Sequence, residues 1–261
     1  MIHLLPFLGY GFLFVTLFMT GLWWQQRRTH NAGIVDVGWS GSIPLLVAGF
    51  GLASPAPWPR ALLFTALAFL WGGRLVVHIH RRSHGEVEDR RYRTLRESWG
   101  EHAQRNFFWF FQFQAVAALL FAGPYLLVFH NVSTILHPLE LFAAVLFVGA
   151  WIGEAAADAQ LAAFKANPAH RGKVCAVGLW KYSRHPNYFF EWCIWVAVAL
   201  AATPAPHGYL AWLCPALMLY FLFKVTGIPA TEAQALRSKG EAYRSYQQST
   251  SAFVPWFPKK G

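Results

Sequence analysis

Seven long apolar segments dominate the sequence and limit what it can fold into. They cover roughly residues 4–24, 34–52, 61–80, 107–129, 138–160, 187–203 and 208–227. Segments 4–24 and 107–129 contain no Asp, Glu, Lys or Arg, and each is long enough to cross a hydrocarbon core of about 30 Å as a helix. The chain is only 13% charged, whereas soluble domains carry about 25% charged residues. The sequence therefore predicts an all-α polytopic membrane protein that forms one domain over residues 1–261.

The first two apolar segments differ from the others. We interpret segment 4–24 as a retained helix rather than a cleavable signal peptide. No positive residue precedes it, its apolar run is too long, and Arg27 and Arg28 follow it. Segment 34–52 is the weakest of the expected spans, because Pro44 and several glycines interrupt it.

The distribution of basic residues predicts the orientation of the spans. If the N-terminus lies outside, the inner segments are 25–33, 81–106, 161–186 and 228–261. They hold 2, 7, 5 and 5 lysines or arginines, which is 19 of the 22 in the chain. This distribution satisfies the positive-inside rule and predicts seven transmembrane helices with an outer N-terminus and a cytoplasmic C-terminus. Because the basic residues are divided among four segments, nucleic acid is not an expected partner, whereas anionic membrane lipid is compatible with them.

A small set of charged and histidine side chains lies within the apolar segments. The members singled out as candidates are Asp36, Arg74, His78, Glu154, Asp158, Glu191 and Lys224. Charged groups are costly inside a bilayer, and they often mark a functional cavity. Arg74 and His78 lie one turn apart on one helix face, and Asn187 and Glu191 share another. All the members except Arg74 lie toward the cytoplasmic half, which favours a cavity open to the cytosol. The alternative is a set of buried ion pairs that fix helix packing.

The inner segment 81–106 is unusual because it contains seven arginines and no lysine. A solvated loop does not require this bias, whereas guanidinium groups suit bidentate recognition of phosphate. The segment therefore predicts a phosphate-rich ligand on the cytoplasmic side. No GxGxxG motif follows a strand, and no GxxxxGK[ST] motif occurs. A nucleotide would have to be held by helix ends and loops of the membrane domain.

Two other classes of membrane protein fit the sequence less well. His80 and His84 have the HxxxH spacing of a di-iron histidine box, but the chain lacks HxxHH, so we expect no metal. A transporter or receptor would also fit seven helices. However, no pair of broken helices marks an inverted repeat, and the polar residues gather on the cytoplasmic side.

Five short blocks carry a resemblance to a known family. The blocks are VDVGW at 35–39, LWGGRL at 70–75, EDRRYRTLR at 88–96, ADAQL at 157–161 and GLWKYSRHPNYFFEW at 178–192. From about residue 34 to Pro255, the chain resembles the bacterial DUF1295 family, which is related to the steroid 5-alpha-reductase C-terminal domain. The RHPNY element also resembles isoprenylcysteine carboxyl methyltransferases. These enzymes use S-adenosylmethionine and are the alternative.

The resemblance implies an NADPH-dependent reductase domain that saturates the activated C=C bond of a lipophilic enone, such as a 3-oxo-Δ4 steroid. It also implies a bacterial inner-membrane protein, with a monomer as the working expectation and the cofactor site facing the cytoplasm. Tyr182, Asn187 and Glu191 match residues that hold the nicotinamide end, and Asp158 belongs to the same site. The full set of residues expected to bind the cofactor is Arg81, Arg90, Tyr92, Arg93, Asp158, Lys173, Tyr182, Arg184, His185, Asn187 and Glu191.

The expected catalytic residues are Asp36, Arg74 and His78. By the resemblance, Asp36 binds the substrate ketone. The eukaryotic enzymes have a Gln–Glu pair where this chain has Val35–Asp36, and they carry a tyrosine on helix three. Hydride transfer to the β-carbon builds charge on the ketone oxygen, and a protonated Asp36 in an apolar site can donate a hydrogen bond to it. Arg74 or His78 is the expected second donor. An ion pair between Asp36 and Arg74, with a structural role, is the alternative.

Overall fold

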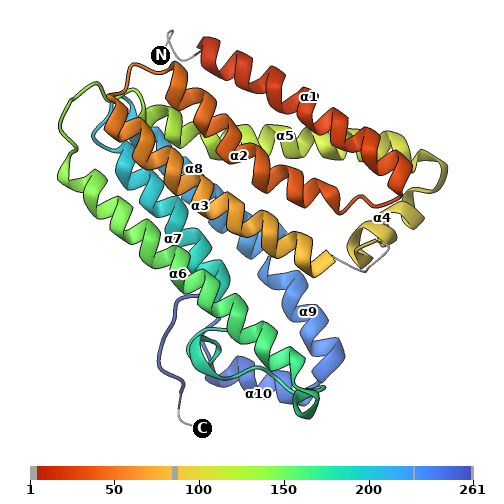
Figure 1. Cartoon of the computed structure of the whole chain (residues 1–261). Coiled ribbons are helices and arrows are strands. Elements are labelled where there is room, and N and C mark those ends of the chain that lie inside the picture. Colours follow the sequence, from red (N-terminus) through yellow and green to blue (C-terminus); the bar gives the residue numbers. More distant parts are fainter. Residues whose placement is uncertain (1–4, 84–87, 226, 260–261) are drawn as a thin grey trace. The chain divides into compact units, whose positions relative to one another are not determined.

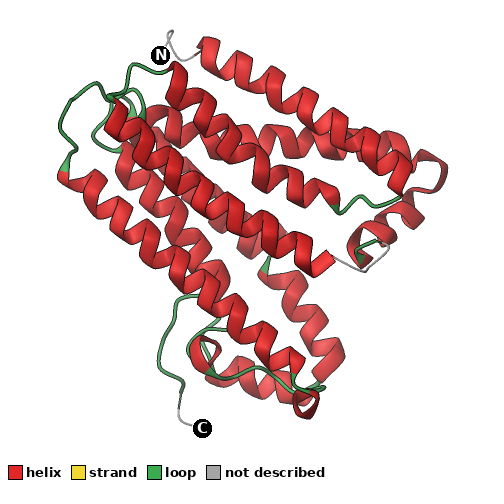
Figure 2. Ribbon diagram, in the orientation of Figure 1, coloured by secondary structure: helices red, strands yellow, loops and turns green. Residues whose placement is uncertain are grey.

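The structure, a computed structural model, describes residues 5–83, 88–225 and 227–259. These residues form helices joined by turns and loops, and they contain no β-strand (Figure 2). The chain divides into two compact units. Unit 1 comprises Met1–His137 and Ala202–Gly208, and unit 2 comprises Pro138–Ala201 and Tyr209–Gly261. The all-α fold expected from the sequence is confirmed, while a single domain over residues 1–261 stays a prediction.

Unit 1 is organised around its second helix. Its helices are α1 (Leu5–Thr29), α2 (Ile34–Ala53), α3 (Trp58–Ser83), α4 (Arg90–Trp99), the 3₁₀-helix η2 (Gly100–His102) and α5 (Ala103–Val128). Helix α2 packs against α1, α3 and α5 (Figure 1). Apolar side chains from three of these helices, among them Met19, Ile43 and Phe111, are fully buried. A helix that contacts three neighbours has little polar surface, which explains why the sequence of α2 is apolar on nearly every side.

Pro44 does not break α2. The helix runs without interruption through it, and the Pro44 ring packs against α3 at Gly72. A Cβ atom on Gly72 would lie 2.8 Å from Cγ of Pro44 and 2.9 Å from the carbonyl oxygen of Ser40. Proline removes one backbone N–H from the helix. The neighbouring glycine lets α3 approach the proline ring closely, so the feature that weakened the sequence prediction is a packing contact.

Unit 2 contains the longest helix of the chain and its C-terminal helices. The elements are α6 (Pro138–Ala166), η3 (Pro168–His170), η4 (Gly178–Lys181), α7 (Pro186–Ala202), η5 (Gly208–Trp212), α8 (Leu213–Tyr220), the π-helix η6 (Phe221–Val225), α9 (Ile228–Lys239) and α10 (Glu241–Ser249). Leu222, Ile228 and Phe253 form a buried cluster against which Phe189 and Trp192 of α7 pack. Through Phe253, the C-terminal segment is part of this core.

Six helical segments within the described residues are long and apolar enough to cross a membrane. They are Leu5–Thr29, Ile34–Ala53, Trp58–Arg81, Arg90–Val128, Pro138–Ala166 and Gly208–Lys239. The seventh expected span, 187–203, is also helical, but α7 has only 17 residues. The inner segment 81–106, expected as a loop, contains α4, η2 and the start of α5. The structure therefore supports a multi-pass membrane protein with six candidate spans.

Candidate functional site

The carboxylate of Asp36, in the first turn of α2, is held by two side chains from α4. The Tyr92 hydroxyl donates a hydrogen bond to Oδ1 over 2.7 Å, and Nη2 of Arg91 donates to Oδ2 over 2.9 Å. Tyr92 is buried, whereas the Arg91 side chain is 60% exposed. Among the described residues, these two are the hydrogen-bond partners of the Asp36 side chain. The alternative ion pair between Asp36 and Arg74 is therefore wrong.

The start of α4 is fixed by its own capping residue. Asp89 is the N-cap and accepts a hydrogen bond from the backbone N–H of Arg91 over 2.8 Å. Its carboxylate also accepts from Nε of Arg91 over 3.2 Å. A capping aspartate satisfies a backbone donor that the helix leaves unpaired. In this chain the cap also aligns the guanidinium that reaches Asp36.

A buried polar network anchors α4 to the turn between α1 and α2. Glu88 is 4% exposed and accepts hydrogen bonds from the N–H of Ala32 over 2.9 Å and from Nη2 of Arg96 over 2.7 Å. Burial alone would raise the pKa of Glu88, but the bonds from Arg96 and Ala32 outweigh it and lower the pKa. Arg96 also lies over the Phe107 ring and donates to Gln26. The network fixes α4 beside the residues that precede Asp36.

The other expected residues of unit 1 lie on α3 and α4. Arg74 and His78 occupy successive turns of α3 and are half-buried, and the remaining expected arginines of the inner segment are exposed. Arg93 donates to the backbone carbonyl of Glu88 over 3.1 Å. The structure thus brings Tyr92 of the expected cofactor set to Asp36 of the expected catalytic set.

In unit 2, two residues expected to hold the nicotinamide contact each other. Nδ2 of Asn187, in the first turn of α7, donates to Oδ1 of Asp158 on α6 over 3.3 Å. One turn further along α7, Oε1 of Glu191 accepts a hydrogen bond from Nε1 of Trp195 over 2.9 Å, and both residues are buried. The result is an amide and two carboxylates from two adjacent helices, with one carboxylate oriented by an indole N–H.

Arg184 and His185 connect the motif to the C-terminal helices. Nε of Arg184 lies 2.6 Å from Oε1 of Glu232 on α9, and its Nη1 donates to the carbonyls of Gln247 and Thr250 over 2.9 and 2.6 Å. His185 Nε2 lies 3.3 Å from the same Glu232 oxygen. Burial lowers the pKa of His185, although Glu232 opposes the shift. These contacts give the two basic residues a structural role in addition to the cofactor role predicted for them.

The C-terminal segment forms one wall of the turn before α7. The backbone N–H of Arg184 donates to the Ser251 carbonyl over 2.8 Å, and that of Trp256 donates to the Tyr182 carbonyl over 2.9 Å. The Tyr182 ring also meets Phe257 edge-on, with 5.9 Å between ring centroids. Lys173 lies apart from these contacts, on the exposed turn after η3.

Sequence reasoning missed three residues with central places in these clusters. Arg91 lies in the block EDRRYRTLR and was not selected as a site residue. Glu88 was quoted in the same block but given no role. Glu232 was not selected, although it is the only acidic residue of α9. Each acts through a partner that is distant in sequence, so no local spacing could have identified it.

The described residues contain no group of three or more His, Cys, Asp or Glu side chains that could hold a metal ion. His84 of the histidine-box alternative lies outside the described residues.

Comparison with known proteins places the chain in a family. The DUF1295 family, described as "Protein of unknown function", matches residues 22–250. The chain is also similar to "Uncharacterized protein C594.04c" of Schizosaccharomyces pombe, with 26% identity over 265 residues that cover 90% of this chain and 75% of the relative. No solved structure matches the chain significantly. The chain therefore belongs to the DUF1295 family, a group similar to steroid 5-alpha-reductases.

Proposed function

We propose that this protein is an NADPH-dependent membrane reductase. It saturates the activated C=C bond of a lipophilic enone, with a 3-oxo-Δ4 steroid as the type substrate. The observation that carries the proposal is the cluster at the first turn of α2, where Asp36 meets the Tyr92 hydroxyl at 2.7 Å and the Arg91 guanidinium at 2.9 Å. A carboxylate, a phenol and a cation gathered at the end of an apolar helix suit the polarisation of a ketone, and membership of the family supports this interpretation.

The cluster contains the donors that the reaction needs. Reduction of an enone at its β-carbon places negative charge on the carbonyl oxygen, and donors aimed at that oxygen lower the barrier. Arg91 has five N–H donors and an exposed side chain, so it can bind the ketone while it remains near Asp36. Tyr92 supplies a phenol beside the same carboxylate, in a chain that lacks the helix-three tyrosine of the eukaryotic enzymes. We assign Asp36 the role of orienting both groups, with Arg74 and His78 as further donors.

The cluster in unit 2 has the donor set that a nicotinamide carboxamide requires. Asn187 offers both a donor and an acceptor, and Asp158 and Glu191 offer acceptors. NADPH, when bound, supplies the hydride. Asn187, Asp158 and Glu191 would hold its carboxamide, and guanidinium groups would bind its phosphates. The proton that completes the reaction at the α-carbon comes from water or from a nearby acid.

The proposal includes seven spans with an outer N-terminus, a cytoplasmic C-terminus and a location in a bacterial inner membrane. Helix α7 supports the seventh span. Its 17 residues rise about 26 Å at 1.5 Å per residue, which lies at the lower end of the range for a membrane-spanning helix. Its sequence between Cys193 and Ala202 contains no charged residue.

Cofactor binding tests the proposal against its main alternative. The purified protein in detergent is titrated with NADPH, NADH and S-adenosylmethionine by calorimetry. NADPH should bind more tightly than NADH and should weaken as salt rises, because guanidinium groups recognise the additional phosphate. If S-adenosylmethionine binds and NADPH does not, the reductase proposal is wrong and the methyltransferase alternative is favoured. Equal affinity for NADPH and NADH would show that the arginines do not recognise the additional phosphate of NADPH.

A further inference from the structure

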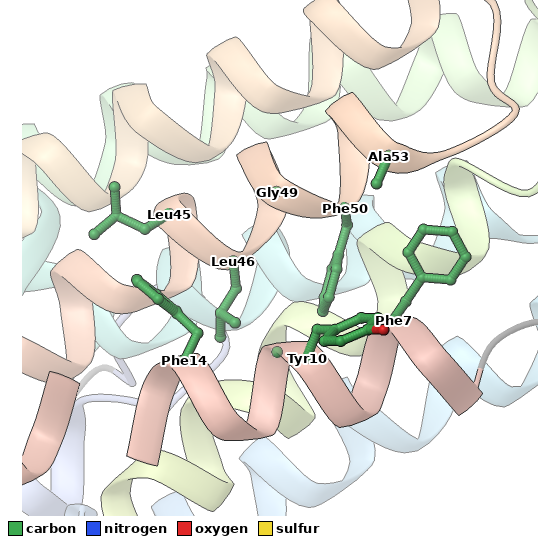
Figure 3. Close-up of a pocket in the computed structure, with 9 residues that line it drawn as sticks. Phe7, Tyr10, Phe14, Leu45, Leu46, Gly49, Phe50 and Ala53 are labelled. Carbon is green, nitrogen blue, oxygen red and sulfur yellow. The ribbon is translucent and has the colours of Figure 1, made fainter. Parts of the chain in front are cut away.

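An apolar groove of about 300 Å³ runs between α1 and α2 in unit 1. Its lining residues are Phe7, Tyr10, Gly11, Phe14, Leu45, Leu46, Gly49, Phe50 and Ala53. In Figure 3, aromatic side chains of α1 face Leu45, Leu46 and Phe50 of α2. The lining contains no charged residue, and the Tyr10 hydroxyl is its one polar side-chain group. The groove is therefore a site for hydrocarbon and not for a polar ligand.

A small residue keeps the groove open. A Cβ atom on Gly49 would meet no atom within 4 Å, whereas one on Gly11 would lie 3.1 Å from side-chain atoms of Leu119 and Phe50. Gly11 therefore belongs to the close-packed floor, and Gly49 borders open space. Both Gly49 and Leu45 are exposed, so the groove opens to the side of the helix pair.

The position of the groove indicates what surrounds it. Both helices are candidate membrane spans, and the lining residues lie near the first residue of α1 and the last residue of α2. No water is available to fill an apolar groove within a bilayer, and apolar cavities stay dry even in soluble proteins. An unfilled groove would forfeit the dispersion contacts of its walls. Within a bilayer, the hydrocarbon chains of lipids are the groups available to occupy the groove.

The dimensions select one hydrocarbon chain. From Leu45 to Ala53, α2 rises about 12 Å at 1.5 Å per residue. A volume of about 300 Å³ along that length makes the groove narrow, which suits a single extended hydrocarbon chain. A helix from a second copy is about 10 Å across, so it is too wide. The groove is also separate from the candidate site, because Leu45 lies nine residues, or about 14 Å, along α2 from Asp36.

We propose that this groove is a binding site for one acyl chain of a membrane phospholipid, with the head group near the turn between α2 and α3. The aromatic rings of Phe7, Phe14 and Phe50 form its rigid walls, and Tyr10, which is 75% exposed, lies at its rim. This site is independent of the reductase function proposed above.

Photolabelling tests the site. The full chain is reconstituted in nanodiscs with a phosphatidylethanolamine that carries a diazirine in the middle of one acyl chain. Labelled residues are mapped by mass spectrometry as the probe fraction rises. The site predicts labelling that saturates and concentrates on the groove residues of α1 and α2. Uniform, non-saturating labelling along α1 would overturn the proposal, because it is what ordinary solvation by lipid produces.

A pair of glycine variants sharpens the test. Gly49→Leu fills the groove and should reduce its labelling by about tenfold, which corresponds to about 1.4 kcal/mol. Gly9→Leu adds the same side chain to α1 outside the groove, where a Cβ atom also meets nothing within 4 Å, and should leave the labelling unchanged. If Gly49→Leu does not fold, the labelling map of the wild type is the test: labelling must saturate and concentrate on the groove residues.

Two competing occupants give different results. If progesterone displaces the label and unlabelled phosphatidylethanolamine does not, the groove holds an enone, and the acyl-chain assignment is wrong. If labelling falls as the number of copies in each nanodisc rises, a second copy covers the groove, and the assignment is also wrong. Displacement of the label by unlabelled phosphatidylethanolamine, and not by progesterone, supports the acyl-chain assignment.

Discussion

At the scale of single residues, the candidate catalytic chemistry depends on Asp36 and its two partners. Tyr92 is buried and Arg91 is exposed, so the same carboxylate holds one rigid and one mobile donor. An exposed ion pair contributes about 0–1 kcal/mol to stability, whereas a buried hydroxyl that loses its acceptor costs about 1–3 kcal/mol. The phenol is therefore the partner that fixes the geometry.

Replacing Tyr92 with phenylalanine tests this arrangement. Tyr92→Phe removes the hydroxyl from Asp36 and should slow turnover of an enone by about 10- to 100-fold, because a hydrogen bond to a charged group contributes about 1.5–3 kcal/mol. Turnover is measured as enone-dependent oxidation of NADPH in detergent. Tyr220→Phe, at an exposed position on α8, is the control and should have normal turnover. Equal rates in the two variants would exclude a role for the Tyr92 hydroxyl.

Asn187 gives a separate test of the cofactor role. Asn187→Ala removes the amide beside Asp158, and the Kd for NADPH should rise by about tenfold, as expected for the loss of about one hydrogen bond. Calorimetric titration measures the Kd, and the melting temperature should change little. Asn167→Ala removes an amide from a surface turn of the same unit, where it caps η3, and should bind NADPH normally. An unchanged Kd in Asn187→Ala would show that this amide does not hold the cofactor.

At the scale of helices, the packing of α2 on α3 depends on one glycine. Gly72→Ala places a methyl group 2.8 Å from the Pro44 ring, and overpacking of this kind costs about 1–3 kcal/mol. Gly73→Ala adds a methyl group that meets nothing within 4 Å, and it should be neutral or stabilising, because alanine favours helices over glycine by about 1 kcal/mol. Thermal melts in detergent should show a lower melting temperature for Gly72→Ala and an equal or higher one for Gly73→Ala. A common shift would contradict the close approach of the two helices.

The position of α4 should depend on pH through Glu88. The folded-state pKa of Glu88 is lowered from its ordinary value of 4.5. Its contribution is therefore complete above about pH 4.5 and is lost as pH falls through the lower folded-state value. Melting temperatures of the wild type and of Glu88→Gln should differ most near neutral pH and should converge as pH falls below 4.5. A difference that grows on acidification would mean that Glu88 is not held by Arg96 as an ionised group.

The sequence predicted the helices better than the contacts between them. Apolar length alone located the long apolar helices, because a bilayer requires long uncharged segments, and even the Pro44 segment is helical. Helix α4 was expected as part of a loop, since its ten residues include four arginines and no apolar stripe of sufficient length. Contacts such as Arg91 with Asp36, 55 residues apart, or Arg184 with Glu232, 48 residues apart, follow from tertiary packing and have no local signature.

At the scale of the whole molecule, each unit contains one of the two polar clusters that the proposed reaction uses. Unit 1 holds Asp36 with Arg91 and Tyr92, and unit 2 holds Asn187 with Asp158. The proposed reaction divides in the same way, into polarisation of a ketone and orientation of a cofactor. A variant of Asp36 should therefore affect the chemical step and leave NADPH binding intact.

Transfer of deuterium from NADPH deuterated at C4 to a lipophilic enone such as progesterone, followed in a single turnover, tests this most directly. The wild type should place one deuterium on the β-carbon of a saturated ketone. Asp36→Ala should bind NADPH normally and transfer deuterium about 10²-fold more slowly, because Arg91 and Tyr92 lose the carboxylate that orients them. Absence of deuterium from the product of the wild type, or transfer by Asp36→Ala at the wild-type rate, would contradict the proposed function.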